Sequence, residues 1–407
     1  MSLARTVRPC RVAVIAFSTL SHDTRVMRAI GTLAEMGHEV LAVGFGDKPA
    51  GVSTFVRLPV AERGWPNRIG MALRHAPAAI APFTAEFLHG LAETNAAARR
   101  VLCELRPDIV HANDWPTLPA AQAAKAVCGS RIVYDSHEFA TEEHAHRLVW
   151  RLLMRAHVAA IEAKGIAAAD RVIAVSDGIA RSLTSQYGLS RLPTVVRNVP
   201  AWQPRPFRPT GHPRRLLFHG ILKDYRGIEA IIAALPVCPD DILTLRGDLA
   251  PGFAPLLTAA IRAAGVANRV TIEPAVPPDE VVGLANSADI GVYLGPTETR
   301  HNRFALPNKL FEYVMAGLAV LVSPGDDMVA LVNRHRFGRV VPRAPDSLGR
   351  ILSELSAAEV DEMKRAALVA ARDLSWDMER AKLEALYAGL TAGCDRGRCA
   401  TSGISPA

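Results

Sequence analysis

The sequence has few cysteines, few lysines and no long hydrophobic run. Six of its 407 residues are cysteine and none forms a CxxC pair, so we expect neither a disulfide scaffold nor a zinc ribbon, and a reducing cytoplasm fits best. The longest apolar runs, such as 314–322, are far shorter than the roughly 20 residues of a spanning helix, and residues 1–10 lack the apolar region of a signal peptide. We therefore expect no membrane span.

Two classes of ligand are also disfavoured. No GxGxxG motif follows a predicted strand, which argues against nicotinamide or flavin binding. No run of lysine and arginine with interleaved aromatic residues occurs, so nucleic-acid binding is not expected. The net charge of +7 comes almost entirely from arginine, since the chain has only seven lysines. This charge favours a phosphorylated small molecule or an anionic membrane as partner, although a solvated basic surface is an equally good explanation.

Short apolar, β-branched runs alternate with helical patterns along the whole chain. Most runs are apolar on both faces, which is typical of parallel strands covered by helices on both sides. Twelve such strands exceed a usual open sheet, so we predict two doubly wound α/β sheets. The predicted strands are 11–17, 39–45, 108–112, 131–136, 171–176, 194–198, 216–220, 242–247, 269–274, 290–294, 319–324 and 339–342.

A proline-rich stretch, 200–213, predicts the boundary between two α/β halves of similar size. It has five prolines and no helical or strand pattern. We expect an N-terminal domain over 1–199 and a C-terminal domain over 214–375. A helix over 376–392 is expected to pack back towards the N-terminal domain, and the tail 393–407 to be disordered.

The segment FALPNKLFEYVMAG, residues 304–317, predicts a helix that starts at Pro307 and Asn308 and stops before Gly317. Lys309 and Glu312 are three residues apart and share one helical face. Helix-start N–H groups and a lysine attract phosphate, and a carboxylate one turn later can accept hydrogen bonds from a ribose diol. The alternative is an ordinary ion pair on the helix surface.

A second cationic segment, LLFHGILKDYRG, spans residues 216–227. A predicted strand ends at Gly220, and Lys223 and Arg226 follow in the loop before a helix at 228–235. Cations at a strand-to-helix junction are well placed to bind a diphosphate. A solvated loop cation is the alternative.

Polar residues also follow predicted strands of the N-terminal half. His137 and Glu138 follow the strand 131–136, and Asn113 and Asp114 follow 108–112. A histidine at such a strand end can exchange a proton near neutral pH, whereas a histidine satisfied within the core is the alternative. Asp23, after the first strand, is expected mainly to cap the helix that carries Val26, Ile30 and Leu33.

Together these pieces resemble glycosyltransferase family GT4, whose GT-B architecture has two facing Rossmann-like domains. The matching segments run in order along almost the whole chain: RVAVIAF, DTRVMR, GHEV, DIVHANDW, YDSHEF, DRVIAVSDGI, LLFHGILKDYRG and ALPNKLFEYVMAG. The resemblance implies an N-terminal acceptor domain and a C-terminal domain for a nucleotide-sugar donor. A bacterial enzyme of polysaccharide, glycolipid or other glycoconjugate synthesis is the expected context.

The resemblance also implies residue roles. Glu312 matches the second glutamate of the EX7E motif, which holds the donor ribose, and Arg226 matches the basic residue at the diphosphate. His137 matches the histidine near the transferred sugar. We expect Lys309 and Lys223 to assist Arg226. The remaining donor residues are Gly220, Leu306, Pro307 and Asn308, and the acceptor side is expected to include Asp23, Asn113, Asp114 and Glu138.

Two positions depart from the family pattern. Phe304 stands where the first glutamate of EX7E is expected, and Ile221 where an arginine usually follows the strand-end glycine. Lys223, Arg303 or Lys309 could supply the missing charge, and Glu298 could reach the sugar. These departures leave open a non-catalytic paralogue that binds nucleotide sugar. A nucleotide-sugar epimerase of the same fold is a second alternative, although it would need several carboxylates in the cleft.

The expected reaction moves a sugar from a nucleoside diphosphate to an acceptor hydroxyl with retention at the anomeric carbon. No metal or other cofactor is expected, since no DxD pair stands in a suitable loop and cations with helix N–H groups would offset the diphosphate charge. The acceptor is expected to be a glycan, a glycolipid or a small molecule. The sequence does not distinguish the nucleotide, the sugar or the oligomeric state.

One stretch of the N-terminal half suggests contact with an anionic membrane. Arg147, Arg151 and Arg155 recur every four residues, with apolar residues around them, and the segment 69–91 adds further apolar side chains. Such a basic, apolar helix can rest on an anionic leaflet. A cytoplasmic protein attached peripherally to the inner face of the membrane is one interpretation. An ordinary amphipathic helix packed on the sheet is the other.

Overall fold

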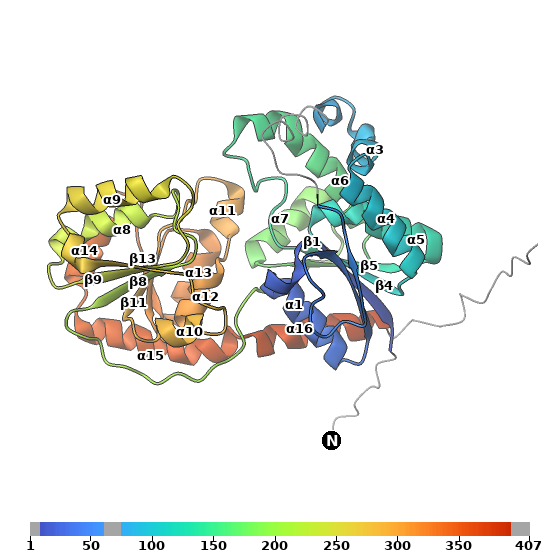
Figure 1. Ribbon diagram of the computed structural model, residues 1–407. Helices are drawn as coiled ribbons and strands as arrows, with labels where there is room; N and C mark the ends of the chain where they lie inside the picture. Colours follow the sequence, from blue (N-terminus) through green and yellow to red (C-terminus); the bar gives the residue numbers. More distant parts are fainter. Residues whose placement is uncertain (1–8, 61–74, 392–407) are drawn as a thin grey trace, which may run out of the picture. The chain divides into compact units, whose positions relative to one another are not determined.

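A computed structural model describes residues 9–60 and 75–391 of the chain (Figure 1). The chain divides into two compact units. Unit 1 contains Met1–Val175, Ile179–Val196 and Arg380–Ala407, and unit 2 contains Ser176–Gly178 and Arg197–Glu379. The predicted disorder of residues 393–407 and most of the segment 1–10, for which no signal peptide was expected, lie outside the described residues.

Unit 1 is built on a seven-stranded sheet in the order β3-β2-β1-β4-β5-β6-β7, with every neighbouring pair parallel. Helices cover both faces, so the side chains of Val12–Ala16 in β1, an interior strand, are buried on both sides. The strands are β1 (Arg11–Thr19), β2 (Glu39–Phe45), β3 (Thr54–Arg57), β4 (Ile109–Asn113), β5 (Arg131–Ser136), β6 (Arg171–Ala174) and β7 (Thr194–Val195).

The helices of unit 1 cross between successive strands, as parallel pairing requires. Helix α16 returns at the end of the chain, and from Arg380 on it belongs to unit 1. The helices are α1 (Thr24–Glu35), α3 (Ala85–Gly90), α4 (Glu93–Leu105), α5 (Leu118–Cys128), α6 (Arg155–Ala168), α7 (Asp177–Tyr187) and α16 (Trp376–Thr391).

Unit 2 has a six-stranded parallel sheet in the order β10-β9-β8-β11-β12-β13. Its strands are β8 (Arg215–His219), β9 (Ile242–Arg246), β10 (Val270–Glu273), β11 (Ile290–Tyr293), β12 (Ala319–Val322) and β13 (Gly338–Val340). All four residues of β11 and all four of β12 are buried, because both lie inside the sheet and under helices on both faces.

The helices of unit 2 form two layers (Figure 1). Helices α8 (Ile228–Ala234), α9 (Phe253–Ala264) and α14 (Ser347–Glu354) cover one face of the sheet. Helices α10 (Val281–Ala285), α12 (Asn308–Met315) and α15 (Ala357–Asp373) cover the other. Two further helices are α11 (Arg300–Phe304) and α13 (Asp326–His335).

The predicted α/β class with two doubly wound parallel sheets is confirmed, and each predicted strand overlaps an observed one. The sequence analysis missed β3, a four-residue edge strand that is half-buried at its centre and exposed at its ends. Such a short edge strand lacks the continuous apolar run that marked the others. Among the described residues no helix is long and apolar enough to span a membrane.

Candidate active site

Two strand ends of unit 2 approach each other closely at Gly220 and Gly247. Gly220 follows β8 with φ of 101°, and Gly247 follows β9 with φ of 147°. A Cβ atom on Gly247 would lie 2.1 Å from the carbonyl oxygen of Gly220, so only glycine fits there. The close approach leaves backbone groups at the carboxyl edge of the sheet, where α/β proteins bind ligands.

Lys309 reaches this edge from the start of α12. Its side chain is buried, with Nζ 4.1 Å from the ring centre of Phe218 and 5.3 Å from that of Tyr293. A Cβ atom on Gly220 would lie 3.2 Å from the same Nζ. The lysine therefore points at the turn after β8, and the ordinary ion pair on the helix surface is the wrong interpretation.

The electrostatic surroundings of Lys309 are cationic. Burial is the main cause that lowers the pKa of Lys309 to about 7, and the nearby charge of Arg226 lowers it further. Lys223 acts in the same direction, and Glu312 opposes it. Lys309, Arg226 and Lys223 come from two segments far apart in the sequence, and their charges act on one another at one edge of the sheet. Glu312 alone opposes them, so the net charge there is positive.

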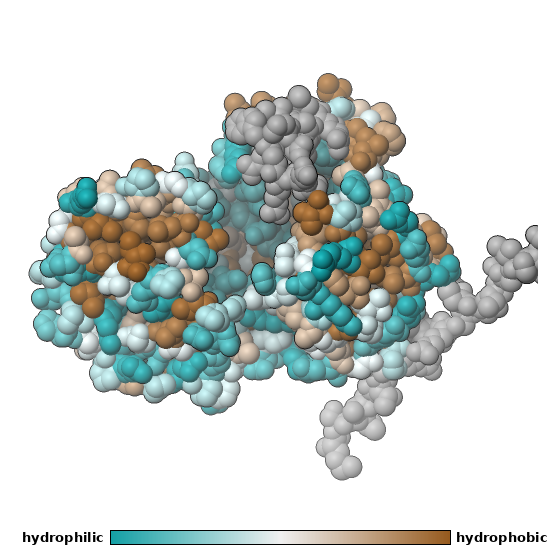
Figure 2. Space-filling model, viewed as in Figure 1, coloured by the Kyte–Doolittle hydropathy of each residue, from teal (hydrophilic) through white to brown (hydrophobic). Residues whose placement is uncertain are grey.

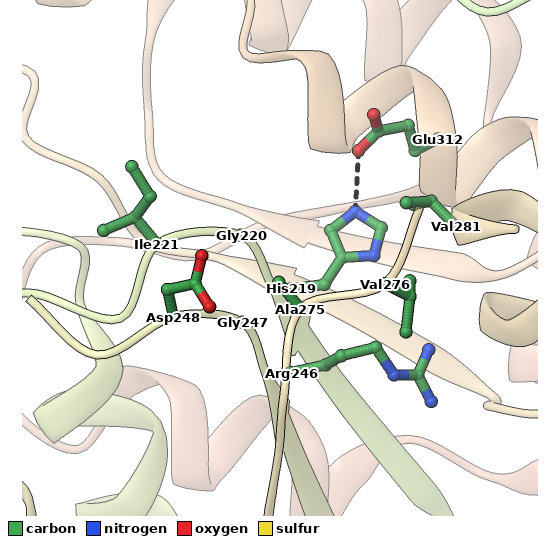
Figure 3. A pocket seen from close by; sticks show the side chains of 10 residues that line it. All are labelled: His219, Gly220, Ile221, Arg246, Gly247, Asp248, Ala275, Val276, Val281 and Glu312. Carbon is green, nitrogen blue, oxygen red and sulfur yellow. Dashed lines mark ion pairs between the residues drawn. The ribbon is translucent and has the colours of Figure 1, made fainter. Parts of the chain in front are cut away.

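Glu312 lies one turn along α12 and faces a cavity of about 210 Å³ (Figure 3). Its Oε2 is 2.8 Å from Nε2 of His219, the last residue of β8. The backbone N–H of His219 donates to the hydroxyl of Tyr313 at 3.1 Å, and the His219 ring lies on the Tyr313 ring at 4.6 Å. Tyr313 thus positions His219, whose ring lies next to the carboxylate of Glu312 at the cavity, where Gly220, Gly247 and Ile221 also line the wall.

The other predicted donor residues surround the start of α12. Pro307 is the N-cap residue with extended backbone, Leu306 is half-buried and Asn308 is exposed. Arg303 is engaged by Asp326 at 2.7 Å.

Glu298 pairs with Arg343 at 2.6 Å and lines a second cavity of about 800 Å³. Arg303 and Glu298, two of the four expected replacements for the missing family residues, are thus held in ion pairs. Among the described residues, the other two, Lys309 and Lys223, form no ion pair with an acidic side chain.

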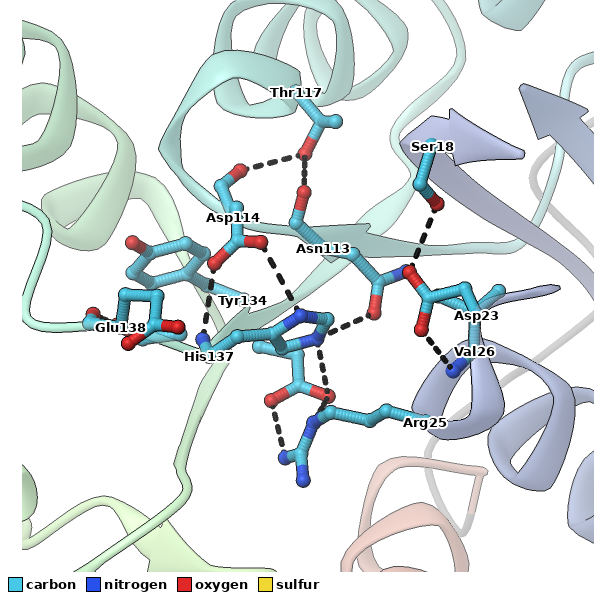
Figure 4. A network of polar contacts seen from close by, with 12 residues as sticks. Ser18, Asp23, Arg25, Val26, Asn113, Asp114, Thr117, Tyr134, His137 and Glu138 are labelled. Carbon is cyan, nitrogen blue, oxygen red and sulfur yellow. Dashed lines mark hydrogen bonds and ion pairs between the residues drawn. The ribbon is translucent and has the colours of Figure 1, made fainter. Parts of the chain in front are cut away.

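In unit 1, His137 lies between Asn113 and Asp114 at the carboxyl edge of the sheet (Figure 4). Nδ1 of His137 is 3.2 Å from Oδ2 of Asp114, and Nε2 is 3.1 Å from Oδ1 of Asn113. The backbone N–H of His137 donates to the other carboxylate oxygen of Asp114 at 3.0 Å. Asp114 holds this position with φ of 61°, a backbone conformation that is strained for a residue with a side chain.

A buried carboxylate completes the surroundings of His137. Asp135 lies 3.6 Å from Nε2 of His137 and is held by two hydrogen bonds from Arg25, at 2.9 and 2.6 Å. Burial alone would lower the pKa of His137, but Asp114 and Asp135 outweigh it and raise that pKa to about 10. This raised pKa favours the protonated ring at neutral pH, and proton exchange by His137 during a reaction stays a prediction.

Two predicted acceptor-side residues have other local contacts. Oδ1 of Asp23 accepts from the backbone N–H of Val26 at 3.2 Å, and its Oδ2 accepts from Ser18 at 2.8 Å, so Asp23 caps α1 as expected. Glu138 follows His137 with an exposed side chain.

Among residues 9–60 and 75–391 no three His, Cys, Asp or Glu side chains are grouped closely enough to bind a metal ion.

Sequence reasoning missed three residues of these sites: His219, Arg25 and Tyr387. The hydroxyl of Tyr387, in α16, lies 2.7 Å from Nδ1 of His111, whose Nε2 lies 3.3 Å from Asp135. A polar residue at the end of an apolar strand could have indicated His219. Nothing local marked Arg25 or Tyr387, since their partners are at least 110 residues away.

Comparison with known proteins identifies the relatives of the chain. The profile of Glycosyltransferase Family 4 matches residues 23–199. Glycogen synthase of Mycobacterium tuberculosis is 30% identical over 152 residues, which cover 35% of this chain and 36% of that protein. The chain thus matches about a third of the length of this curated relative.

Solved structures share the fold over almost the entire chain. Sucrose-phosphate synthase from Thermosynechococcus elongatus has a TM-score of 0.72 at 14% identity and covers 94% of this chain and 100% of its own. HepE of Anabaena, solved with UDP-glucose, has a TM-score of 0.68 at 15% identity and covers 93% and 100%. Residues 23–199 thus match the profile of Glycosyltransferase Family 4, and the two parallel sheets of the chain share the fold of the GT-B glycosyltransferases.

Proposed function

We propose that the chain transfers a sugar from a nucleoside diphosphate sugar to the hydroxyl group of an acceptor. The observation that carries this proposal is the position of the Lys309 ammonium beside Gly220, which lines the same cavity as Glu312; the charges of Arg226 and Lys223 are near enough to lower the pKa of Lys309. Cations at a strand edge suit a diphosphate, and a carboxylate beside them suits a ribose diol. The family match supports the reaction class, and the relative solved with UDP-glucose supports a nucleotide-sugar donor.

In this proposal unit 2 binds the donor without a metal ion. Lys309, Arg226 and Lys223 offset the charge of the departing diphosphate, and the N–H groups at the start of α12 assist them. Gly220, Leu306, Pro307 and Asn308 contact the nucleotide or sugar through backbone groups. EDTA is then expected to leave transfer unchanged.

Unit 1 contributes the acceptor side. The acceptor oxygen bonds to the anomeric carbon on the face that the diphosphate leaves, and the acceptor proton passes to the departing phosphate, so that the configuration is retained. His137 supplies a fixed positive charge rather than a base, since both its ring nitrogens face acceptor oxygens. Asn113, Asp114 and Glu138 surround it. We propose a glycan, a glycolipid or a small molecule as acceptor, in the cytoplasm.

A second candidate function is nucleotide-sugar binding without transfer. It is favoured by Ile221, which is exposed at the wall of the cavity where the family pattern has an arginine. Phe304 favours it for the same reason, because the family pattern has a glutamate at this position and phenylalanine has no carboxylate.

The test is a panel of UDP, GDP, ADP, TDP and their sugar conjugates, measured first by thermal shift and then by product formation. A ligand at 100 times its Kd is expected to stabilise the fold by about 2.7 kcal/mol. Stabilisation by one nucleotide together with sugar transfer supports the enzyme. Stabilisation with neither transfer nor donor hydrolysis supports the second candidate, and a flat panel contradicts both.

A further inference from the structure

Six large apolar side chains of unit 1 are exposed to solvent. We call them the apolar rim: Ile80, Phe83 and Phe87 on one segment, and Leu148, Val149 and Leu152 on the other. Each is at least 59% exposed, and Ile80 reaches 93%. A monomeric surface exposes single apolar residues routinely, but a group of six aromatic and aliphatic side chains is typical of an interaction site.

The fold brings the two segments of the rim together. Ile80 follows η2 (Ala76–Ala79), Phe83 lies in η3 (Pro82–Thr84) and Phe87 in α3. These short helices pack on α6 and on the π-helical turn η5 (Trp150–Met154) that precedes it. Figure 2 shows brown side chains on this part of unit 1, at the top of the view. Segments about 60 residues apart in the sequence thus form one surface.

The charge around the rim is positive. Glu142 pairs with Arg155 and Glu86 with Lys164, and burial raises the pKa of Glu143 to about 7, so this carboxyl is only partly charged at neutral pH. Arg147 and Arg151 are exposed, and neither pairs with an acidic side chain of the described residues. The expected stripe of three arginines is therefore wrong, because Glu142 engages Arg155 and the π-helical turn interrupts the four-residue spacing.

We propose that the apolar rim rests on the surface of an anionic bilayer, with its side chains at the acyl boundary and Arg147 and Arg151 among the lipid phosphates. Apolar side chains flanked by uncompensated arginines match the two layers of such a surface. A second copy of the chain fits less well, since a two-fold contact would set these arginines against each other. The proposal goes beyond the proposed function and needs no step of sugar transfer.

Co-sedimentation with vesicles tests the proposal without donor or acceptor. The full chain is expected to sediment with vesicles of phosphatidylcholine and phosphatidylglycerol, to stay in solution with phosphatidylcholine alone, and to be released by salt. Arg147→Glu with Arg151→Glu is expected to weaken binding about 25-fold or more, at about fivefold for each positive charge removed. Phe83→Ser with Phe87→Ser is expected to weaken it as well.

Matched controls lie elsewhere on unit 1. Arg100→Glu changes an exposed arginine of α4, and Val127→Ser an exposed apolar residue of α5; both are expected to bind as the parent chain does. Unchanged circular dichroism and thermal melting show that the rim variants fold. The proposal is overturned if the parent chain stays in solution with anionic vesicles, or if the rim variants bind like the controls. It is overturned too if rim substitutions convert a dimer in solution to a monomer.

Discussion

Asn113 fixes the charge of His137 through the orientation of its amide. Nδ2 of Asn113 donates to the carbonyl oxygen of Ile15 at 3.0 Å, so its Oδ1 faces Nε2 of His137 at 3.1 Å. Because Asp114 accepts at Nδ1, both ring nitrogens meet acceptors, and only the imidazolium can donate to both. The charge therefore follows from geometry, and the raised pKa agrees with it.

This arrangement predicts how unit 1 responds to pH. The raised pKa of His137, about 10, means that its stabilising contacts are complete below the unfolded value of about 6.5 and are lost as pH rises through 10. Thermal stability is therefore expected to fall as pH rises from about 6.5 to 10, and less steeply in His137→Gln. In ¹⁵N spectra the ring is expected to stay an imidazolium from pH 6 to 9, and Asp114→Asn to bring its titration into that range. A neutral ring at pH 7.5 in the parent chain contradicts the assignment.

Lys309 predicts a proton-coupled affinity for the donor. Its pKa is about 7, so the ammonium is half deprotonated at neutral pH, whereas a diphosphate favours the charged form. Above pH 7 the affinity for a nucleotide sugar is expected to fall by about tenfold per pH unit, because the fraction of protein with a protonated Lys309 decreases. Calorimetry in buffers of different ionisation enthalpy measures the proton uptake. Lys309→Met removes the pH dependence, while Lys223→Met keeps it; equal slopes in both variants would place the titrating group elsewhere.

Removing the carboxylate at the cavity is expected to weaken donor binding. A hydrogen bond to a charged group contributes about 1.5–3 kcal/mol, so Glu312→Gln is expected to raise the donor KM about 10- to 100-fold. Glu312→Ala is expected to lose more, since His219 then loses its partner. Glu354→Gln, on the exposed side of α14, is the matched control. If Glu312→Ala turns over at the rate of the parent chain, Glu312 does not take part in donor binding.

Buried histidines predict a loss of stability in acid. Burial lowers the pKa of His157 to about 3 and that of His89 to about 4. The unfolded chain takes up protons at about pH 6.5 and the folded chain does not, so unfolding becomes easier as pH falls from 6.5 to 4, at up to about 1.4 kcal/mol per pH unit for each histidine. Denaturant unfolding at pH 7, 6 and 5 measures the slope. His157→Phe is expected to reduce this dependence of the unfolding free energy on pH, and His22→Gln, at an exposed histidine, is expected to leave it unchanged. The same slope in the parent chain and in both variants would show that buried histidines do not cause it.

The sequence by itself determined the local architecture. Runs such as 39–45 and 290–294 are apolar on both faces, and strands between two helical layers require that pattern. The helix over 308–315 was predictable because Pro307 and Gly317 mark its ends within the sequence. The positions of Glu312, Arg226 and His137 at strand or helix ends followed from the same local signals.

Only the tertiary structure decided what those residues do electrostatically. The burial of Lys309 depends on Phe218 and Tyr293 from two other strands, and the charge of His137 depends on Asn113, Asp114 and Asp135. The apolar rim likewise exists because segments far apart pack side by side. Spacing along the chain carries no such information, since a pKa and an exposed surface are set by neighbours in space.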